Sequence, residues 1–345
     1  MTGSPDTRPV VPVLLGPTGA GKTALLDTLI DSSDGVELPL PPIEIISCDS
    51  RQIYRELEIG SAAPDAELRA RLPHHLVGIL EPTATYSAAQ FRTDALAAID
   101  DVLQRGRLPI VAGGSGFYFR ALHTGLFEVD VDADRRTEIR EQVIALGPAE
   151  RLRRLRELDP GAVLAEAGRQ ASAGCVHPND DYRISRALEI CLGSGRRYSE
   201  IWAETRERGL SGDAGAAGPY RFAGWRLEVE REEYWRNLAE RAGEMVSFGI
   251  AAEAGRVFER YGMCAGLETL GYADALAAWR GEIDGAELAE RLFIAHRQYG
   301  KRQRTWLRGE NALSACDPVS LKGDFRRRLA ACLSTSDAKL RRLFY

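Results

Sequence analysis

The sequence predicts an α/β fold in which a parallel sheet is flanked by helices and carries a mainly helical insertion domain. The phosphate-binding pattern G-x-x-x-x-G-K-[ST] occurs as GPTGAGKT at residues 16–23, directly after the apolar run VVPVLL. Two further apolar runs, IEIIS and LPIVAGG, alternate with helical stretches, as the strands of a parallel sheet do. Together these features predict a P-loop NTPase-like sheet.

The strands are expected in the order of the chain. Residues 10–15 form the first, followed by the glycine-rich loop and a helix. The next two apolar runs end at Asp49 and Ser115. Because the carboxyl ends of parallel strands meet at one edge, the loop, Asp49 and Ser115 should face one crevice.

The rest of the chain predicts an insertion and a return to the sheet. From about residue 131 to residue 193 the sequence is arginine-rich and helical, with breaks at DPGAV and HPND. RFAGWRLEV then predicts another strand, and residues 230–261 a long helix. We place the P-loop core at residues 1–128 and 196–345, and a helical insertion at 129–195.

Composition limits the functions to consider. The chain has 345 residues, 44% hydrophobic and 28% charged, which suits a globular protein with a sizeable core. Its formal net charge of -5 excludes a polycation that coats nucleic acid, so any such contact must come from local basic clusters.

Cysteine spacing and hydropathy indicate the compartment. The six cysteines form no C-x-x-C pair, so reduced thiols are expected rather than a zinc site or a disulfide framework. The opening MTGSPDTRP lacks the apolar core of a signal peptide, and no uncharged stretch approaches the roughly 18 residues that span a bilayer. We therefore expect a cytoplasmic protein with no membrane partner.

The glycine-rich loop has the residue types that hold a phosphate. Glycines let backbone N–H groups crowd round an oxyanion, and the helix N-terminus favours negative charge. Lys22 is expected to reach the outer phosphate oxygens and Thr23 to hold Mg²⁺. The candidate diphosphate-binding residues of the loop are Gly16, Pro17, Thr18, Gly19, Ala20, Gly21, Lys22 and Thr23.

The acid of the site stands at an early strand. An ATPase of this fold carries an acid at the end of a later strand, where it helps to hold Mg²⁺ and orient water. That strand end has Ser115 here, so activation of water is not indicated. Asp49 stands where small-molecule and nucleotide kinases place groups that meet the acceptor; a turn or N-cap aspartate is the other interpretation.

Nine motifs in register make the chain resemble the tRNA dimethylallyltransferases, also called tRNA isopentenyltransferases or the IPP transferase family. Over residues 13–308 they are GPTGAGKT, SCDSRQIY, GSAAP, LPHHLVGILEP, YSAAQFRTDA, PIVAGGSGFYFRAL, HPNDDYRISRALEI, GMCAGLETLGY and KRQRTWLR. The resemblance implies that a dimethylallyl group passes from dimethylallyl diphosphate to N6 of the adenosine just 3′ of the anticodon, and that diphosphate leaves.

The resemblance also implies roles for single residues. Asp49 would be the general base for the adenine amine, and Ser115, where the family usually has threonine, would bond the bridging oxygen. Thr23 with Mg²⁺, the loop and Arg231 would hold the diphosphate. Ser115 as a turn residue and Arg231 as a surface charge remain the alternatives.

The tRNA partner would bring its anticodon stem-loop, since enzymes that act on a base take it out of its stack. KRQRTWLR places cations beside stacking rings, although a solvated helix face is the alternative. The residues that the resemblance implies as tRNA contacts are Asp49, Ser50, Arg51, Gln52, Ser115, Arg136, Tyr182, Arg183, Ile184, Ser185, Arg186, Glu268, Thr269, Leu270, Gly271, Tyr272, Ala273, Lys301, Arg302, Gln303, Arg304, Thr305, Trp306, Leu307 and Arg308.

Besides Ser115, three positions depart from the family pattern. Ala63 stands for a lysine, His296 for a threonine, and Asn237 for an arginine, with Arg236 one place earlier. An offset of one residue rotates a helical side chain by about 100°. These departures bear on RNA affinity and secondary diphosphate contacts more than on the reaction.

Two other functions stay open at this point. An ATP-dependent small-molecule or nucleotide kinase would share the loop, the fold and Asp49, but has no use for KRQRTWLR. A non-catalytic RNA-binding module would need only that basic segment. We expect a monomeric enzyme that uses Mg²⁺, dimethylallyl diphosphate and tRNA, and needs no ATP.

Overall fold

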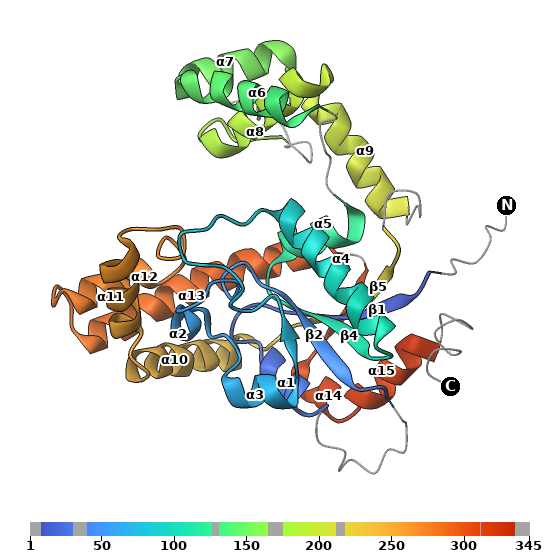
Figure 1. Ribbon diagram of the computed structural model, residues 1–345, viewed down its shortest axis with the longest axis vertical. Coiled ribbons are helices and arrows are strands. Elements are labelled where there is room, and N and C mark those ends of the chain that lie inside the picture. The colour runs from blue at the N-terminus through green and yellow to red at the C-terminus, as the bar shows by residue number, and fades with distance from the viewer. Residues whose placement is uncertain are drawn as a thin grey trace. The chain divides into compact units, whose positions relative to one another are not determined.

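The computed structural model describes residues 8–29, 40–125, 131–164, 175–211, 218–310 and 312–334. It divides into two compact units (Figure 1). The first unit combines Met1–His123 with Gly218–Tyr345, and the second unit is Thr124–Ala217. Within the described ranges, no helix is long and apolar enough to cross a membrane.

A six-stranded parallel sheet forms the centre of the first unit, in the order β3-β2-β4-β1-β5-β6. This confirms the expected α/β class. The strands are β1 (Val10–Leu15), β2 (Ile43–Cys48), β3 (His74–His75), β4 (Leu108–Gly113), β5 (Arg221–Leu227) and β6 (Leu313–Cys316).

The register of the sheet determines where the site lies. Gly113, the last residue of β4, is paired with Leu15 of β1 on one side and with Cys48 of β2 on the other. Every residue of β1 and β4 is buried, as the continuous apolar runs of a parallel sheet require. Three strands therefore end side by side at one edge.

Helices cover the sheet on both faces. Leu14, Ile45 and Leu108 share a core with apolar residues of α1, α3, α14 and α15. Figure 1 shows α4 and α5 on the opposite side. The helices of this unit are α1 (Lys22–Asp27), α2 (Glu58–Ser61), α3 (Ala66–Arg71), α4 (Ala88–Gln104), α5 (Gly116–Thr124), α10 (Arg231–Ser247), α11 (Ile250–Tyr261), α12 (Tyr272–Trp279), α13 (Gly285–Leu307), α14 (Pro318–Lys322) and α15 (Phe325–Ser334).

The long helix expected over residues 230–261 is interrupted, so this expectation was wrong in part. The chain forms α10 and α11, separated by Phe248 and Gly249. Gly249 has φ 89°, in the left-handed region that glycine adopts without a steric penalty and that ends a helix. Apolar periodicity continues across the break, which is why the sequence pattern did not reveal it.

The second unit is helical and consists of α6 (Ala133–Ala145), α7 (Pro148–Leu158), α8 (Asp181–Ser194) and α9 (Tyr198–Ser211). Ile184 and Ala187 of α8 pack with Leu155 of α7. Tyr198 and Ile201 of α9 pack against the same helix α8. Because α9 shares this core, the unit extends to residue 217, whereas the expected boundary at residue 195 leaves α9 outside it.

Candidate active site

The phosphate loop between β1 and α1 depends on glycine at two positions. Gly19 and Gly21 have φ angles of 75° and 77°, in the left-handed region. A Cβ on Gly19 would also lie 2.7 Å from Cδ2 of Leu238 in α10. The loop begins against β4, since the backbone N–H of Gly16 donates to the carbonyl of Gly113 at 3.1 Å. Backbone conformation and close packing thus both require the motif's glycines.

Lys22 folds back over this loop. Its Nζ donates to the carbonyls of Gly16 and Pro17 at 2.8 and 2.9 Å. Burial lowers the pKa of Lys22 to about 8, although the nearby Asp49 carboxylate acts in the opposite direction. The ammonium group is therefore protonated at neutral pH and available to an anion in the loop.

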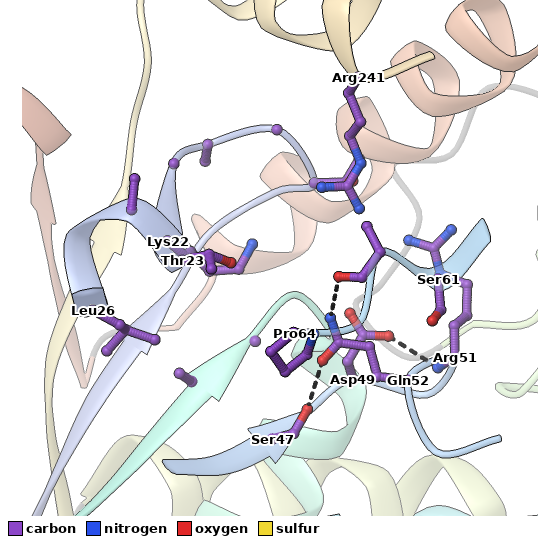
Figure 2. Close-up of a pocket in the computed structure, with 18 of the residues that line it drawn as sticks. Lys22, Thr23, Leu26, Ser47, Asp49, Arg51, Gln52, Ser61, Pro64 and Arg241 are labelled. Atoms are coloured by element: carbon purple, nitrogen blue, oxygen red, sulfur yellow. Dashed lines mark hydrogen bonds between the residues drawn. The ribbon is translucent and has the colours of Figure 1, made fainter. Parts of the chain in front are cut away.

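A pocket of about 440 Å³ opens beside the loop, within the first unit. Figure 2 shows Lys22 and Thr23 facing the same space as Asp49 and Arg241. The residues that line the pocket include Thr18, Gly19, Ala20, Gly21, Lys22 and Thr23 of the loop, Ser47, Asp49, Arg51, Gln52, Ser61, Ala62 and Pro64 near β2, Asn237, Glu240, Arg241 and Glu244 of α10, and Gln303 of α13.

Asp49 follows directly after β2 and lines the pocket. Its Oδ1 accepts a hydrogen bond from the backbone N–H of Arg51 at 2.9 Å (Figure 2). This contact is the Asx turn that the alternative interpretation anticipated. This hydrogen bond orients the carboxylate, so Asp49 both stabilises the turn and lines the pocket.

Ser115 lies at the neighbouring strand end, just before α5. Its backbone N–H donates to the carbonyl of Cys48 at 3.1 Å, and the Sγ of Cys48 donates back to its carbonyl at 3.5 Å. The backbones of Ser115 and Asp49 are therefore adjacent across β2 and β4. Ser115 does not line the pocket, unlike Asp49 and Thr23.

Helix α10 presents a different arginine from the expected one. Arg231 is exposed on the first turn, where its guanidinium lies 4.3 Å from the centre of the Trp235 ring, and it does not line the pocket. Arg241 reaches into the pocket from above in Figure 2. Burial and the nearby Arg51 lower the pKa of Arg241 to about 10. Among the described residues, its buried Nε has no hydrogen-bond partner.

Sequence reasoning missed Arg241, although a signal existed. Arg241 follows Asn237 by four residues, so the two share one face of α10. Asn237 also lines the pocket, and its Nδ2 donates to the carbonyl of Gly19 at 3.4 Å. Asn237, which stands for the family's arginine, thus contacts the loop backbone. The positive charge on this face of α10 comes from Arg241, one turn later.

Gln303 of α13 links two parts of the site. Its Oε1 accepts from the backbone N–H of Thr18, and its Nε2 donates to the carbonyl of Gly114, both at 2.9 Å. A Cβ on Gly114 would lie 2.4 Å from that Nε2, so a side chain there would break the contact. The C-terminal basic motif thereby connects the phosphate loop to the β4–α5 turn.

The other two departures have different surroundings. His296 is fully buried in α13, and burial beside Arg241 and Arg51 lowers its pKa to about 3, so the imidazole is neutral. In the described part of the chain, neither ring nitrogen has a hydrogen-bond partner. Ala63 follows α2, with its N–H bonded to the carbonyl of Glu58 at 2.9 Å. Neither position carries a charge toward the pocket.

The expected tRNA contacts divide by exposure. Arg136 and residues 182–186 belong to the second unit, and the rest belong to the first. The exposed ones are Arg136, Tyr182, Arg183, Arg186, Glu268, Ala273, Lys301, Arg302, Thr305 and Arg308. The buried ones are Arg51, Ile184, Gly271, Tyr272, Gln303 and Leu307, and the remainder are half-buried. Tyr272, for example, bonds Glu253 and the Leu57 carbonyl in the core.

The fold brings the phosphate-loop motif and the carboxylate of Asp49 to one cavity of a parallel α/β sheet. Residues 52–310 match the model of the IPP transferase family, and the chain belongs to that family. It is 35% identical to the tRNA dimethylallyltransferase of Koribacter versatilis over 308 residues, which are 88% of this chain and 91% of that protein. The resemblance inferred from the nine motifs is confirmed.

Two solved structures are similar over most of the chain. The tRNA isopentenylpyrophosphate transferase of Bacillus halodurans has a TM-score of 0.62 and 27% identity, over 95% of this chain and 97% of that one. A eukaryotic dimethylallyltransferase, described as acting on tRNA, has a TM-score of 0.72 over 93% of this chain and 78% of that one. At 23% identity, this second likeness supports the fold alone.

Proposed function

We propose that this chain transfers the dimethylallyl group of dimethylallyl diphosphate to N6 of the adenosine just 3′ of the anticodon in tRNA. The observation that carries the proposal is the shared pocket of Asp49 and the phosphate loop, in a chain of the prenyltransferase family. In the reaction, the bond between the allylic carbon and the diphosphate oxygen breaks, a bond from that carbon to N6 forms, and one N6 proton is lost.

The diphosphate would lie between the loop and α10. Loop N–H groups and the helix N-terminus attract anions. Lys22 and Arg241 face the same space from two sides (Figure 2). Charge develops on the leaving diphosphate in the transition state, and donors already in place stabilise it without reorganisation. This arrangement favours departure of the diphosphate.

The adenine would enter from the side of Asp49. An exocyclic amine is a weak nucleophile until its proton is accepted, and Asp49 is the carboxylate at the end of β2 in the pocket. Ser115 stays our candidate for the bridging oxygen because its backbone lies beside Cys48, next to Asp49.

The residues present fit a magnesium ion that arrives with the substrate. Mg²⁺ commonly takes one or two protein ligands and completes its shell with substrate phosphates and water. Thr23 is exposed in the pocket and offers such a hydroxyl. When bound, the ion would supply charge neutralisation at the diphosphate. Among the described residues, no group of three His, Cys, Asp or Glu side chains could hold a metal ion.

One assay tests the proposal against both alternatives. The protein is incubated with unmodified tRNA, labelled dimethylallyl diphosphate and Mg²⁺, without ATP, and label in the RNA is counted. We expect transfer, and we expect Asp49→Asn to lower its rate by about 10²–10⁴-fold. A kinase would instead consume ATP, and an RNA-binding module would retain RNA without labelling it. Absence of label over a series of salt concentrations would overturn the proposal.

A further inference from the structure

Phe117 is an exposed aromatic residue beside the active site. It lies on the first turn of α5, two residues after Ser115, and 54% of its surface is exposed. A single exposed apolar side chain is ordinary in a protein surface. Phe117 differs because its ring has a partner and because that partner belongs to the basic motif of α13.

The partner is Trp306. The two ring centres are 6.3 Å apart and the planes meet at 81°, an edge-to-face pair. The indole is tightly packed: a Cβ on Gly116 would lie 2.5 Å from it. Arg120 covers one face, with its guanidinium carbon 3.8 Å from the ring centre. Since Arg120 Nε also donates to the buried carboxylate of Glu310 at 3.0 Å, this stack is fixed in place.

Exposed cations precede and follow Trp306 in the chain. Arg302 lies one helical turn before it in α13, and Arg308 is the C-cap residue of that helix. Fixed rings among cations are what single-stranded nucleic acids bind, because bases stack on the rings while phosphates meet the charges. The rings and the cations together fit a partner that is both aromatic and anionic.

The pair also lies close to the acceptor side of the pocket. Ser115 is bonded to Cys48, and Cys48 precedes Asp49. When an enzyme withdraws one base from its stack, the bases on either side lose a stacking partner. A neighbouring base therefore needs a new surface within a short distance of Asp49.

We infer that Phe117, backed by Trp306, is a stacking platform for a tRNA base adjacent to the acceptor adenosine. This inference rests on the proposed function and extends it to Phe117, which is not among the tRNA contacts expected from the sequence. Phe117 supplies an exposed ring, Trp306 and Arg120 keep it from collapsing inward, and the outer cations hold the backbone.

The test compares Phe117→Ala with Phe117→Trp, using an unmodified anticodon stem-loop RNA as the probe. We expect Phe117→Ala to raise the Kd for this RNA roughly tenfold or more, the usual loss for one base–aromatic stack. Phe117→Trp should bind like the wild type. The matched control is Phe248→Ala, which removes a phenylalanine that is 70% exposed and does not line the pocket.

A second readout separates stacking from charge. With 2-aminopurine beside the acceptor adenosine, stacking quenches fluorescence, and Phe117→Ala should restore it while leaving the salt dependence of binding unchanged. Phe117→Leu keeps apolar volume and should behave like Phe117→Ala. If Phe117→Ala and Phe117→Leu both bind the RNA with the wild-type Kd and both still quench the 2-aminopurine fluorescence, the proposed platform is wrong. Binding is measured without transfer, so failure of the proposed function would show separately as wild-type protein that binds RNA but never labels it.

Discussion

The two walls of the pocket are built in different ways. One wall is the phosphate loop, eight consecutive residues with their conformation set by glycines. The other wall combines Asp49 after β2, Arg241 of α10 and Gln303 of α13. We expect the loop wall to bind an anion by local chain geometry, whereas the composite wall exists only when distant segments have folded together. Under the proposed function, the proton acceptor belongs to the composite wall.

Removing the acid of the composite wall should have the largest effect. Asp49→Asn keeps the size and the Asx turn but cannot accept the adenine proton, so turnover should fall by about 10²–10⁴-fold, the usual contribution of a general base. Single-turnover transfer with saturating tRNA measures it, and Kd values for tRNA and diphosphate should change little. Retained turnover with weakened tRNA binding would instead make Asp49 a binding residue.

Arg241 should come next. Arg241→Ala removes a buried charged donor from the pocket, and we expect KM for dimethylallyl diphosphate to rise roughly 10- to 100-fold, as for loss of a charged hydrogen bond. Arg231→Ala is the matched control on the same helix, because Arg231 stacks on Trp235 outside the pocket. Equal effects of the two substitutions, or a larger effect of Arg231→Ala, would show that Arg241 is not the main arginine that binds the diphosphate.

Gln303 tests whether the two walls depend on each other. Gln303→Met removes both hydrogen bonds at similar volume, leaving the Thr18 N–H and the Gly114 carbonyl unpaired. We expect kcat/KM for the diphosphate substrate to fall roughly five- to tenfold, with tRNA affinity nearly unchanged. Gln303→Glu, which can still accept from Thr18, should lose less. A selective loss of tRNA affinity would make Gln303 an RNA contact.

The smallest effect concerns the loop wall and pH. Because the pKa of Lys22 is lowered to about 8, its charge is present below that pH and is lost above it. Affinity for inorganic diphosphate should therefore fall roughly fourfold between about pH 7 and about pH 8.5. Calorimetric titration measures this, and Lys22→Met should bind weakly at both pH values without that step. If Lys22→Met shows the same loss of diphosphate affinity with rising pH, a titrating group other than Lys22 causes it.

The loop wall was predictable from sequence, and so were its supporting strands. Continuous apolar runs identified β1, β2 and β4, and the loop motif is contiguous. β3 has only His74 and His75, too short for a period of two to show. The break at Gly249 was missed because one glycine within a helical pattern is compatible with either outcome.

The composite wall was only partly predictable. Asp49 could be placed because a strand end fixes its position in the fold. Arg241 depends on the rotational phase of α10, and several arginines on this helix made the choice ambiguous. Gln303 lies within a run of charged residues that predicts an exposed face, yet its side chain is only 5% exposed. Tertiary contacts, rather than local pattern, decide which side of such a helix turns inward.

The hydrogen bond between Thr18 and Gln303 joins residues 285 positions apart. A ribosome makes the phosphate loop well before it reaches Gln303. Until α13 has been made, the growing polypeptide thus carries a loop whose Thr18 N–H lacks its final partner. This link between the phosphate loop and α13 can form only when α13 has emerged and docked.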